Sequence, residues 1–197
     1  MRLHREDLPA TTARLRSGEP VTLRLMRPED AGAFGDYLEG LSEDTRRRWG
    51  PHPHDRPTAE SICASLDPDD IARFVITLDE GSGSRIIAYL LLKLPVLDGD
   101  RDRYHRLAIE LDPAVTASLA PSVADDHQDQ GVGGLLMEYA VNSARLLGMK
   151  RIVLWGGVQA TNARAIRYYV RSGFRKVGEF FNDKNNHDMF LDLPPVG

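Results

Sequence analysis

Residues 128–134, which read Q-D-Q-G-V-G-G, constrain the fold of this chain more than any other segment. They follow an apolar segment that ends near Val123 and precede a run in which apolar residues recur at helical spacing. Gly131 and Gly133 carry no side chain that would keep a ligand away from the backbone. A helix that begins here presents N–H groups without intrahelical partners and a partial positive charge. A strand, a glycine turn and a helix N-terminus in this order predict an anion site, most often for a phosphate group.

The size, charge and cysteine content of the chain limit its function classes. Its 197 residues allow one domain with a full hydrophobic core, and the net charge of −4 argues against broad nucleic-acid binding, which needs a basic face. The single cysteine, Cys63, excludes an internal disulfide, suits a reducing cytoplasm, and is better explained as a small buried residue than as a nucleophile. Residues 1–9 hold no apolar run of signal-peptide length, and residues 86–92, the most apolar run, are only a strand long. We therefore expect a cytoplasmic protein that binds no nucleic acid and enters no membrane.

Hydrophobic periodicity predicts strands and helices over most of the chain. Strands are expected at residues 21–26, 74–78, 85–94, 116–124, 151–155, 175–181 and 188–193. Helices are expected at residues 29–41, 42–48, 58–66, 132–147 and 162–172. The alternation of Leu107, Ile109 and Leu111 suggests an additional strand within residues 98–114. Residues 1–20 are expected to form a loosely packed N-terminal arm, so that residues 21–197 make up a single domain.

Two nucleotide-binding motifs do not fit the residues around the glycine turn. A Rossmann dinucleotide fold would have a further spaced glycine near the start of a βαβ unit. This chain has Met137 instead, and its turn lies two-thirds of the way along the chain. A Walker loop also fails, because no G-K-S or G-K-T follows. The turn therefore predicts a different phosphorylated ligand.

At two places the chain resembles a known family. Val123 followed by Gln128-x-x-Gly131-x-Gly133 is similar to the acetyl-CoA loop of the GNAT superfamily of N-acetyltransferases. The segment N-x-x-A-I-x-x-Y-x-x-x-G-F that follows this loop in the family is matched by Asn162, Ala165, Ile166, Tyr169, Gly173 and Phe174. The resemblance is strong over residues 116–193 and weaker over residues 21–94, where R-P-E-D and the next helix resemble a GNAT N-terminus.

The resemblance implies an α/β fold with a mixed, mostly antiparallel twisted sheet flanked by helices on both faces. It implies that acetyl-CoA is the cosubstrate and that backbone N–H groups of the loop hold its pyrophosphate. The strand that ends at Val123 would pair with the pantetheine arm and diverge from the strand at residues 152–155. The residues matched to cofactor binding are Val123, Gln128, Asp129, Gln130, Gly131, Val132, Gly133, Gly134, Asn162 and Tyr169.

Tyr169 is the predicted catalytic residue. It matches the family tyrosine near the thioester sulfur, and a phenol with an ordinary pKa of about 10 can protonate the departing CoA thiolate at neutral pH. The alternative is a core aromatic, because Tyr169 shares an apolar stripe with Ile166. Its neighbour Tyr168 is expected to pack, and Asn162 can cap the helix as well as contact the cofactor.

The general base is not identified by the resemblance. Several GNAT enzymes carry a glutamate in the strand before the loop, and Ala117 stands at that position here. The alternatives are Glu110, Asp125 and Asp126, or a base that acts through water. This departure keeps open a non-catalytic CoA-binding sensor as a rival to the enzyme.

Residues 49–54, W-G-P-H-P-H, must form a shaped loop after the three arginines at residues 46–48. The loop either binds an anionic part of the substrate, or supplies a histidine, or is a rigid surface loop. His52 and His54 lack companion ligands at metal-site spacing, and the aspartates of residues 98–102 lack the glycine and glutamate of a calcium loop. No metal is therefore expected.

We expect the chain to transfer an acetyl group from acetyl-CoA to an amine of a small molecule or protein by direct attack on the thioester. The expected partners are acetyl-CoA and an amine acceptor, and a homodimer is left open. The identity of the acceptor does not follow from the sequence, and a different acyl donor is a further alternative.

Overall fold

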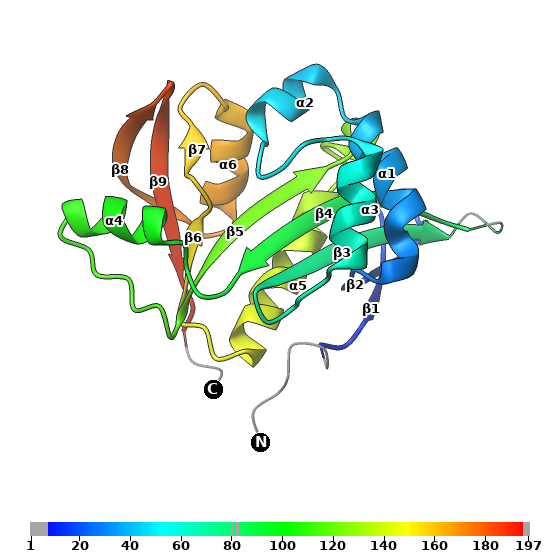
Figure 1. Cartoon of the computed structure of the whole chain (residues 1–197), viewed down its shortest axis with the longest axis horizontal. Coiled ribbons are helices and arrows are strands. Elements are labelled where there is room, and N and C mark those ends of the chain that lie inside the picture. The colour runs from blue at the N-terminus through cyan, green and yellow to red at the C-terminus, as the bar shows by residue number, and fades with distance from the viewer. Residues whose placement is uncertain (1–7, 80, 82, 195–197) are drawn as a thin grey trace.

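The computed structural model describes residues 8–79, 81 and 83–194, which form a twisted sheet with helices on both faces (Figure 1). The strands are β1 (Thr11–Arg14), β2 (Pro20–Leu25), β3 (Ile71–Asp79), β4 (Ser84–Lys93), β5 (Thr116–Val123), β6 (Arg151–Leu154), β7 (Val158–Gln159), β8 (Arg175–Asn182) and β9 (Lys184–Asp192). The helices are α1 (Ala31–Gly40), α2 (Glu43–Arg48), α3 (Arg56–Ala64), α4 (Asp98–Arg106), α5 (Val132–Leu146) and α6 (Ala163–Arg171), with 3₁₀ turns at Pro28–Asp30 and Asp125–His127.

The sheet is mixed and mostly antiparallel, as the sequence predicts. Its strand order in the described residues is β1-β2-β3-β4-β5-β6-β9-β7, and β8 pairs with β9. Among these pairs, β5 and β6 are parallel and the others are antiparallel. The expected fold class is therefore confirmed.

Apolar side chains are buried on both faces of the sheet. On one face Leu136 of α5 packs in a cluster with Leu90 of β4. On the other face Phe34 of α1 packs against Tyr89 of β4, with ring centroids 4.6 Å apart. Because successive side chains of a strand point to opposite faces, the neighbours Tyr89 and Leu90 pack into the clusters on opposite faces of the sheet. Burial of each large apolar side chain stabilises the fold by about 1.5–3 kcal/mol.

β5 and β6 separate part-way along their length. Their parallel register runs from Thr116 opposite Arg151 to Leu119 opposite Leu154. The last hydrogen bond joins the N–H of Trp155 to the C=O of Leu119, at 2.9 Å. Beyond this point β5 continues to its end paired with β4, whereas the chain after β6 turns toward β7, which pairs with β9. The predicted divergence of the two strands is thus present.

A glycine pair makes the turn that leads away from β5. Gly156 and Gly157 have φ angles of 66° and 72°, in the left-handed region that favours glycine. A Cβ added at Gly157 would lie 2.8 Å from the carbonyl oxygen of His187. The backbone therefore passes too close to β9 at Gly157 for any side chain.

Residues 98–114 contain the helix α4 rather than the additional strand suggested by the sequence. Asp98 and Asp100 lie in the first turn of α4, and Arg103 and Arg106 lie in its last turn. This order of charges stabilises a helix through its dipole. The chain then turns at Ala108, where φ is 57°, so the alternating apolar residues fall on a turn and an irregular segment.

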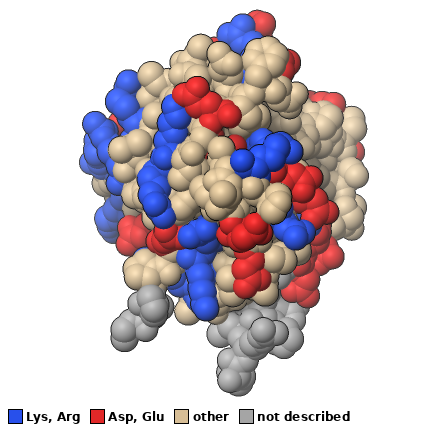
Figure 2. All heavy atoms as spheres, turned by 90° about the vertical axis from the view of Figure 1, so that its left-hand side faces the viewer, with Lys and Arg blue, Asp and Glu red and all other residues tan. Residues whose placement is uncertain are grey.

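α4 is fastened to the sheet by buried polar groups. The guanidinium of Arg103 donates to Asp100 at 2.6 Å and to Asp188 of β9 at 3.1 Å. The hydroxyl of Tyr104 donates to the C=O of Met189 at 2.8 Å. On the side of the molecule formed by α4, β8 and β9, basic and acidic side chains are interspersed (Figure 2).

The described part of the expected N-terminal arm is packed against the sheet. β1 pairs with β2 in antiparallel register, and Leu8 and Leu15 are only 6% and 5% exposed. The hydroxyl of Tyr139 on α5 also donates to the C=O of Pro9, at 2.9 Å. The prediction of loose packing is therefore wrong for residues 8–20. Little in the sequence predicts this packing, since a strand of four residues has only a weak periodic signal. We infer that the domain begins before residue 21; residues 1–7 lie outside the described residues.

Candidate active site

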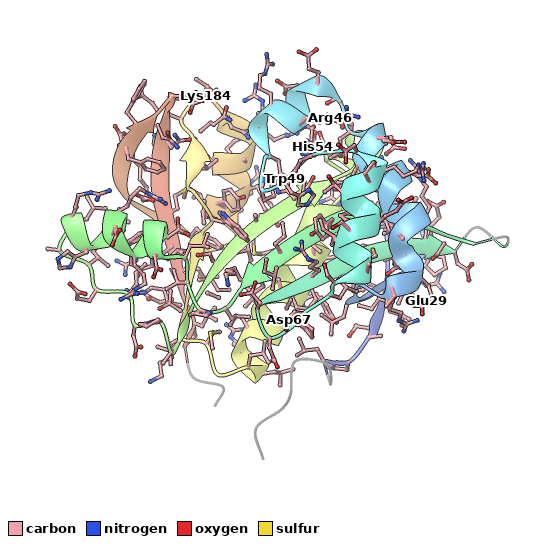
Figure 3. All side chains as sticks on the ribbon, in the orientation of Figure 1. Glu29, Arg46, Trp49, His54, Asp67 and Lys184 are labelled. Carbon is pink, nitrogen blue, oxygen red and sulfur yellow. The ribbon has the colours of Figure 1, made fainter. Side chains whose placement is uncertain are left out.

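A cleft of about 890 Å³ opens where β5 and β6 part. Its floor is the end of β5, and its walls include the glycine loop, α6 and the end of α2. Figure 3 shows Trp49, which follows α2, and Lys184, at the start of β9, on different sides of this region. The cleft therefore lies at the strand divergence that the sequence predicts.

Backbone alternation decides which groups β5 presents to the cleft. The C=O of Leu119 faces β6, whereas the N–H of Ala124 donates to Ile87 on the β4 side, at 2.9 Å. Because backbone groups alternate along a strand, Pro121 and Val123 face the same side as Leu119. Proline has no N–H, so the strand amide offered to a ligand beyond the last β6 pair is that of Val123.

The glycine loop leads directly into α5. Gly131 is the N-cap of α5 with a φ angle of 90°, and its C=O accepts from the N–H of Gly134 at 3.0 Å. The N–H groups of Val132 and Gly133 come before this first hydrogen bond, so they have no acceptor within the helix and lie at the positive end of its dipole. The hydroxyl of Tyr168 donates to the C=O of Gly133 at 2.7 Å, and a Cβ on Gly133 would lie 3.2 Å from the Tyr168 ring. A small residue is therefore needed between α5 and α6 here.

The other residues of the loop have different surroundings. Gln128 Nε2 donates to the C=O of Val123 at 3.0 Å and so closes the loop onto the end of β5. Asp129 lines the cleft with a φ angle of 61°. Gln130 is exposed and donates to the C=O of Asp126 at 2.7 Å, away from the cleft lining. The side chain of Val132 is fully buried in the core, so only its backbone can serve a ligand.

Basic side chains dominate the charged lining of the cleft. The acidic residues among the lining are Asp129 and Asp183. The basic residues are Arg16, Arg47, Arg48, Arg164, Arg167, Arg171 and Lys184. This excess of positive charge raises the local concentration of anionic ligands. Together with the helix N-terminus, it fits the phosphate groups of coenzyme A.

Tyr169 and Asn162 bring α6 to the cleft. Tyr169 lines the cleft, is 8% exposed, and packs against the rings of Tyr168 and Phe174 with centroid separations of 5.2 and 5.5 Å. Burial raises its pKa, which keeps the phenol protonated at neutral pH. Asn162 lines the cleft and accepts from the N–H of Ala165 at 3.1 Å, which makes it the N-cap of α6.

Comparison with known protein families decides the assignment. The model of the acetyltransferase (GNAT) family matches residues 36–174. The chain belongs to the acetyltransferase (GNAT) family. This result confirms both the resemblance seen in the sequence and the expected enzyme class, an acetyl-CoA-dependent N-acetyltransferase. The contacts of individual site residues with acetyl-CoA stay predictions.

Solved structures of GNAT proteins share the fold. The GNAT domain of S. lividans PAT has a TM-score of 0.73 and 21% identity, covering 93% of this chain and 97% of that chain. The aminoglycoside acetyltransferase AAC(6')-Ib in complex with coenzyme A has a TM-score of 0.67 and 21% identity, covering 87% of this chain and 94% of that chain. The ribosomal-protein-S18-alanine N-acetyltransferase from Escherichia coli has a TM-score of 0.58 and 22% identity, covering 90% of this chain and 96% of that chain. No curated protein sequence matches the chain.

The three carboxylates considered as general base of this GNAT protein lie away from the cleft lining. Glu110 is exposed and bonds to His105 at 2.6 Å. Asp125 accepts from Ser42 and Thr45 of the α2 turn. Burial acts to raise its pKa, but the hydrogen bonds from Ser42 and Thr45 together lower it. Asp126 pairs with Arg85 and His127. The structure therefore gives all three carboxylates other contacts, and the choice among Glu110, Asp125, Asp126 and a base acting through water stays a prediction.

Sequence reasoning missed a buried carboxylate that supports the strand divergence. Asp100 of α4 is 1% exposed and accepts from Ser118 Oγ of β5 at 2.7 Å. It also accepts from the N–H of Gly156 at 3.1 Å, just after β6 ends. Asp100 therefore joins the two strands at the point where they part. No local signal marks it, because Ser118 and Gly156 are distant in sequence.

The loop of residues 49–54 covers the sheet beside the cleft. His54 Nε2 bonds to the C=O of Trp49 at 2.9 Å, and both residues lie beneath α2 (Figure 3). His52 Nδ1 lies 2.7 Å from the C=O of Pro53, which can only accept, so Nδ1 carries the proton. Burial lowers the pKa of both histidines. Trp49 and Pro51 line the cleft, which connects this loop to the site.

No group of three or more metal-binding side chains occurs among residues 8–79, 81 and 83–194. In the same part of the chain, each helix is too short or too polar to cross a membrane.

Proposed function

We propose that this GNAT protein transfers the acetyl group of acetyl-CoA directly to an amine of a small molecule or protein. The observation that supports the proposal most is the cleft at the β5–β6 divergence, with the glycine loop at one end and Tyr169 in its wall. The amides of residues 131–133 and the basic lining would hold the phosphates. The open edge of β5 would pair with the pantetheine arm.

Val123 and Tyr169 are the residues proposed to act on the reacting atoms. Bound acetyl-CoA supplies a thioester carbon that forms a C–N bond with the amine as its C–S bond breaks. The N–H of Val123 would stabilise the oxyanion, since it is the amide that β5 presents to the cleft. Tyr169, kept protonated by burial, would donate its proton to the leaving thiolate. The amine would lose its proton to water, because the candidate carboxylates are engaged elsewhere.

Thiol release from acetyl-CoA tests the proposal against the sensor alternative. The purified protein is mixed with acetyl-CoA and a panel of amines that includes amino acids, amino-acid amides, polyamines and peptides. Calorimetry on the same sample measures CoA binding. Amine-dependent thiol release with formation of the N-acetyl product supports the enzyme. Tight CoA binding without turnover on any amine would favour a sensor.

The proposed location is the cytoplasm. The single cysteine, Cys63, is buried and is free rather than in a disulfide, which suits a reducing compartment. The proposal predicts activity in a cytoplasmic extract, which fractionation of the native host would test.

A further inference from the structure

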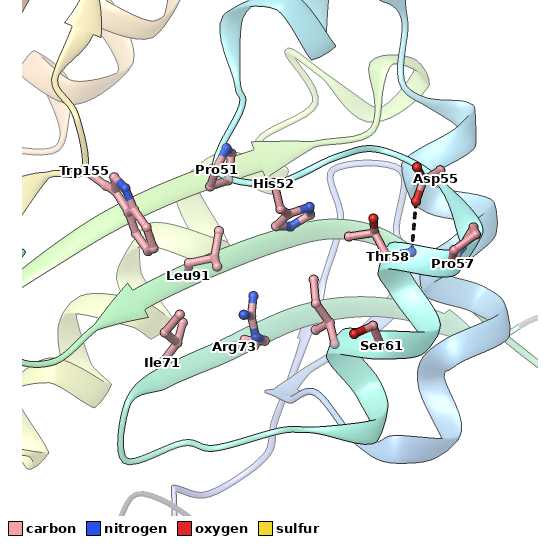
Figure 4. A pocket seen from close by; sticks show the side chains of 11 residues that line it. Pro51, His52, Asp55, Pro57, Thr58, Ser61, Ile71, Arg73, Leu91 and Trp155 are labelled. Atoms are coloured by element: carbon pink, nitrogen blue, oxygen red, sulfur yellow. Dashed lines mark hydrogen bonds between the residues drawn. The ribbon is translucent and has the colours of Figure 1, made fainter.

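A second cavity, of about 400 Å³, adjoins the cleft on the sheet face covered by α1 and α3 (Figure 4). Pro51 and Trp155 line both cavities. Trp155 also makes the last backbone hydrogen bond between β6 and β5, so the two cavities meet at the strand divergence. The far wall is the start of α3, with Thr58 and Ser61. An amine held in this second cavity would face the thioester across Trp155.

Arg73 extends from β3 into the middle of the second cavity (Figure 4). Its guanidinium donates to the hydroxyl of Tyr89, a neutral partner because burial raises the pKa of that phenol. No ion pair joins Arg73 to a carboxylate among residues 8–79, 81 and 83–194. Arg24, Arg103 and Arg151 are also shielded and do have carboxylate partners. Arg46, half-buried like Arg73, donates to the C=O of Glu39 instead.

The remaining titratable groups of the second cavity do not neutralise Arg73. Asp55 lines the cavity, but its carboxylate caps α3 by accepting from the N–H of Thr58 at 2.9 Å. His52 is uncharged near neutral pH, because burial lowers its pKa and the charge of Arg73 lowers it further. Arg73 is half-buried. A partly desolvated cation without a counter-charge costs free energy, and an anionic ligand recovers part of that cost.

We propose that the second cavity binds the acceptor through a carboxylate that pairs with Arg73, so that the acceptors are small amines of amino-acid type. This inference rests on the proposed acetyl transfer and names its substrate class. The planar guanidinium matches a carboxylate in two-point geometry. The apolar walls formed by Ile62, Ile71 and Leu91 would contact the acceptor side chain. A polycationic acceptor would meet repulsion from Arg73.

Matched pairs of acceptors test the substrate class. The standard L-amino acids are compared with their carboxamides by thiol release from acetyl-CoA, after correction for the fraction of uncharged amine. The expected kcat/KM for the best amino acid exceeds that of its amide by about tenfold or more, the size of one charge-assisted hydrogen bond. Equal or greater kcat/KM for the amides would overturn the proposal.

Variants of Arg73 assign the preference to this residue. Arg73→Met should reduce the ratio of kcat/KM for the amino acid to that for its amide to about one. Arg73→Lys keeps the charge but not the planar two-point geometry of the guanidinium, so it should retain part of the preference. Arg101→Met is the control, because Arg101 is exposed on α4 and lines neither cavity. If Arg73→Met does not fold, Arg73→Lys carries the test through a reduced preference. An undiminished preference in Arg73→Met, or in Arg73→Lys where only that variant folds, would contradict the proposal.

Binding separates this inference from the proposed function. Calorimetry titrates the best amino acid and its amide into the CoA-loaded protein. Arg73-dependent binding of the amino acid without turnover would support the carboxylate site and overturn the acetyl transfer. Turnover of amides or polyamines alone would overturn the carboxylate site and leave the acetyl transfer standing.

Discussion

The carboxylate of Asp100 on α4 accepts a hydrogen bond from the backbone N–H of Gly156, 3.1 Å away, at the place where the chain turns from β6 toward β7. The same carboxylate accepts from Ser118 of β5 and from Arg103. One side chain outside the sheet thus holds both strands at the mouth of the cleft.

Asp100→Ala should therefore destabilise the protein and weaken acetyl-CoA binding. Removing one partner of a buried charged network costs about 3–5 kcal/mol, and each kcal/mol lowers the Tm of a chain this size by roughly 2–4 °C. Calorimetric unfolding and the KM for acetyl-CoA measure the two effects. Asp98→Ala is the control: Asp98 is 91% exposed in its side chain, and its loss should change the stability by no more than about 0.5 kcal/mol. Equal losses of stability in Asp100→Ala and Asp98→Ala would contradict the view that Asp100 holds β5 and the start of the turn toward β7 together.

Tyr169→Phe should lower kcat by about a hundredfold with little change in the KM for acetyl-CoA, since a general acid contributes about 10²–10⁴-fold. The ring that packs against Tyr168 and Phe174 is retained, so the fold should persist. Steady-state thiol release measures the effect. Tyr104→Phe removes a buried hydroxyl that bonds to Met189 on β9, and should cost stability of about 1–3 kcal/mol while leaving kcat intact. A wild-type kcat in Tyr169→Phe would remove the proposed proton donor.

Local signals explain which parts of the site could be predicted. The glycine loop and the N-cap Asn162 depend on residues within a few positions, and the structure places both beside the cleft. Only Gln130, and the side chain of Val132, lie off the cleft lining among the predicted cofactor-binding residues. Short-range patterns are thus sufficient to place the glycine loop and the N-cap of α6 beside the cleft.

Long-range contacts explain what could not be predicted. Asp100 matters because of its hydrogen bonds with Ser118 and Gly156. Arg73 matters because it donates to Tyr89 and forms no ion pair with a carboxylate of the described residues. The alternation at residues 107–111 suggested a strand, yet α4 and a turn at Ala108 occupy this region. Such features depend on which elements the fold brings together.

Gly133→Ala should raise the KM for acetyl-CoA by about tenfold, equivalent to about 1.4 kcal/mol. The added Cβ would lie 3.2 Å from the ring of Tyr168, which must shift within the cleft wall. Gly99→Ala on α4 is the matched control, because nothing lies within 4 Å of its added Cβ. The control should gain about 0.5–1 kcal/mol of stability and bind CoA as the wild type does. A normal KM in Gly133→Ala would show that the loop tolerates a side chain.

His52 should make the stability fall as the pH drops below about 6.5. Burial and the charges of Arg73 and His54 lower its pKa in the folded state, while the C=O of Pro53 and Asp55 oppose the shift. Below its unfolded pKa, the unfolded chain binds a proton that the folded chain resists, so acid favours unfolding. Denaturant unfolding between pH 7.5 and 5.5 measures the slope. His52→Gln should reduce the slope, of which His54 keeps a part because burial lowers its pKa as well. An unchanged slope would exclude His52 as a source.

A crystal structure of the complex with acetyl-CoA tests the central claim most directly. The pyrophosphate should contact the amides of residues 131–133, and the thioester oxygen should lie within hydrogen-bond distance of the Val123 N–H. The sulfur should lie beside the hydroxyl of Tyr169. A pyrophosphate bound away from the glycine loop, or a thioester outside the β5–β6 divergence, would contradict the account.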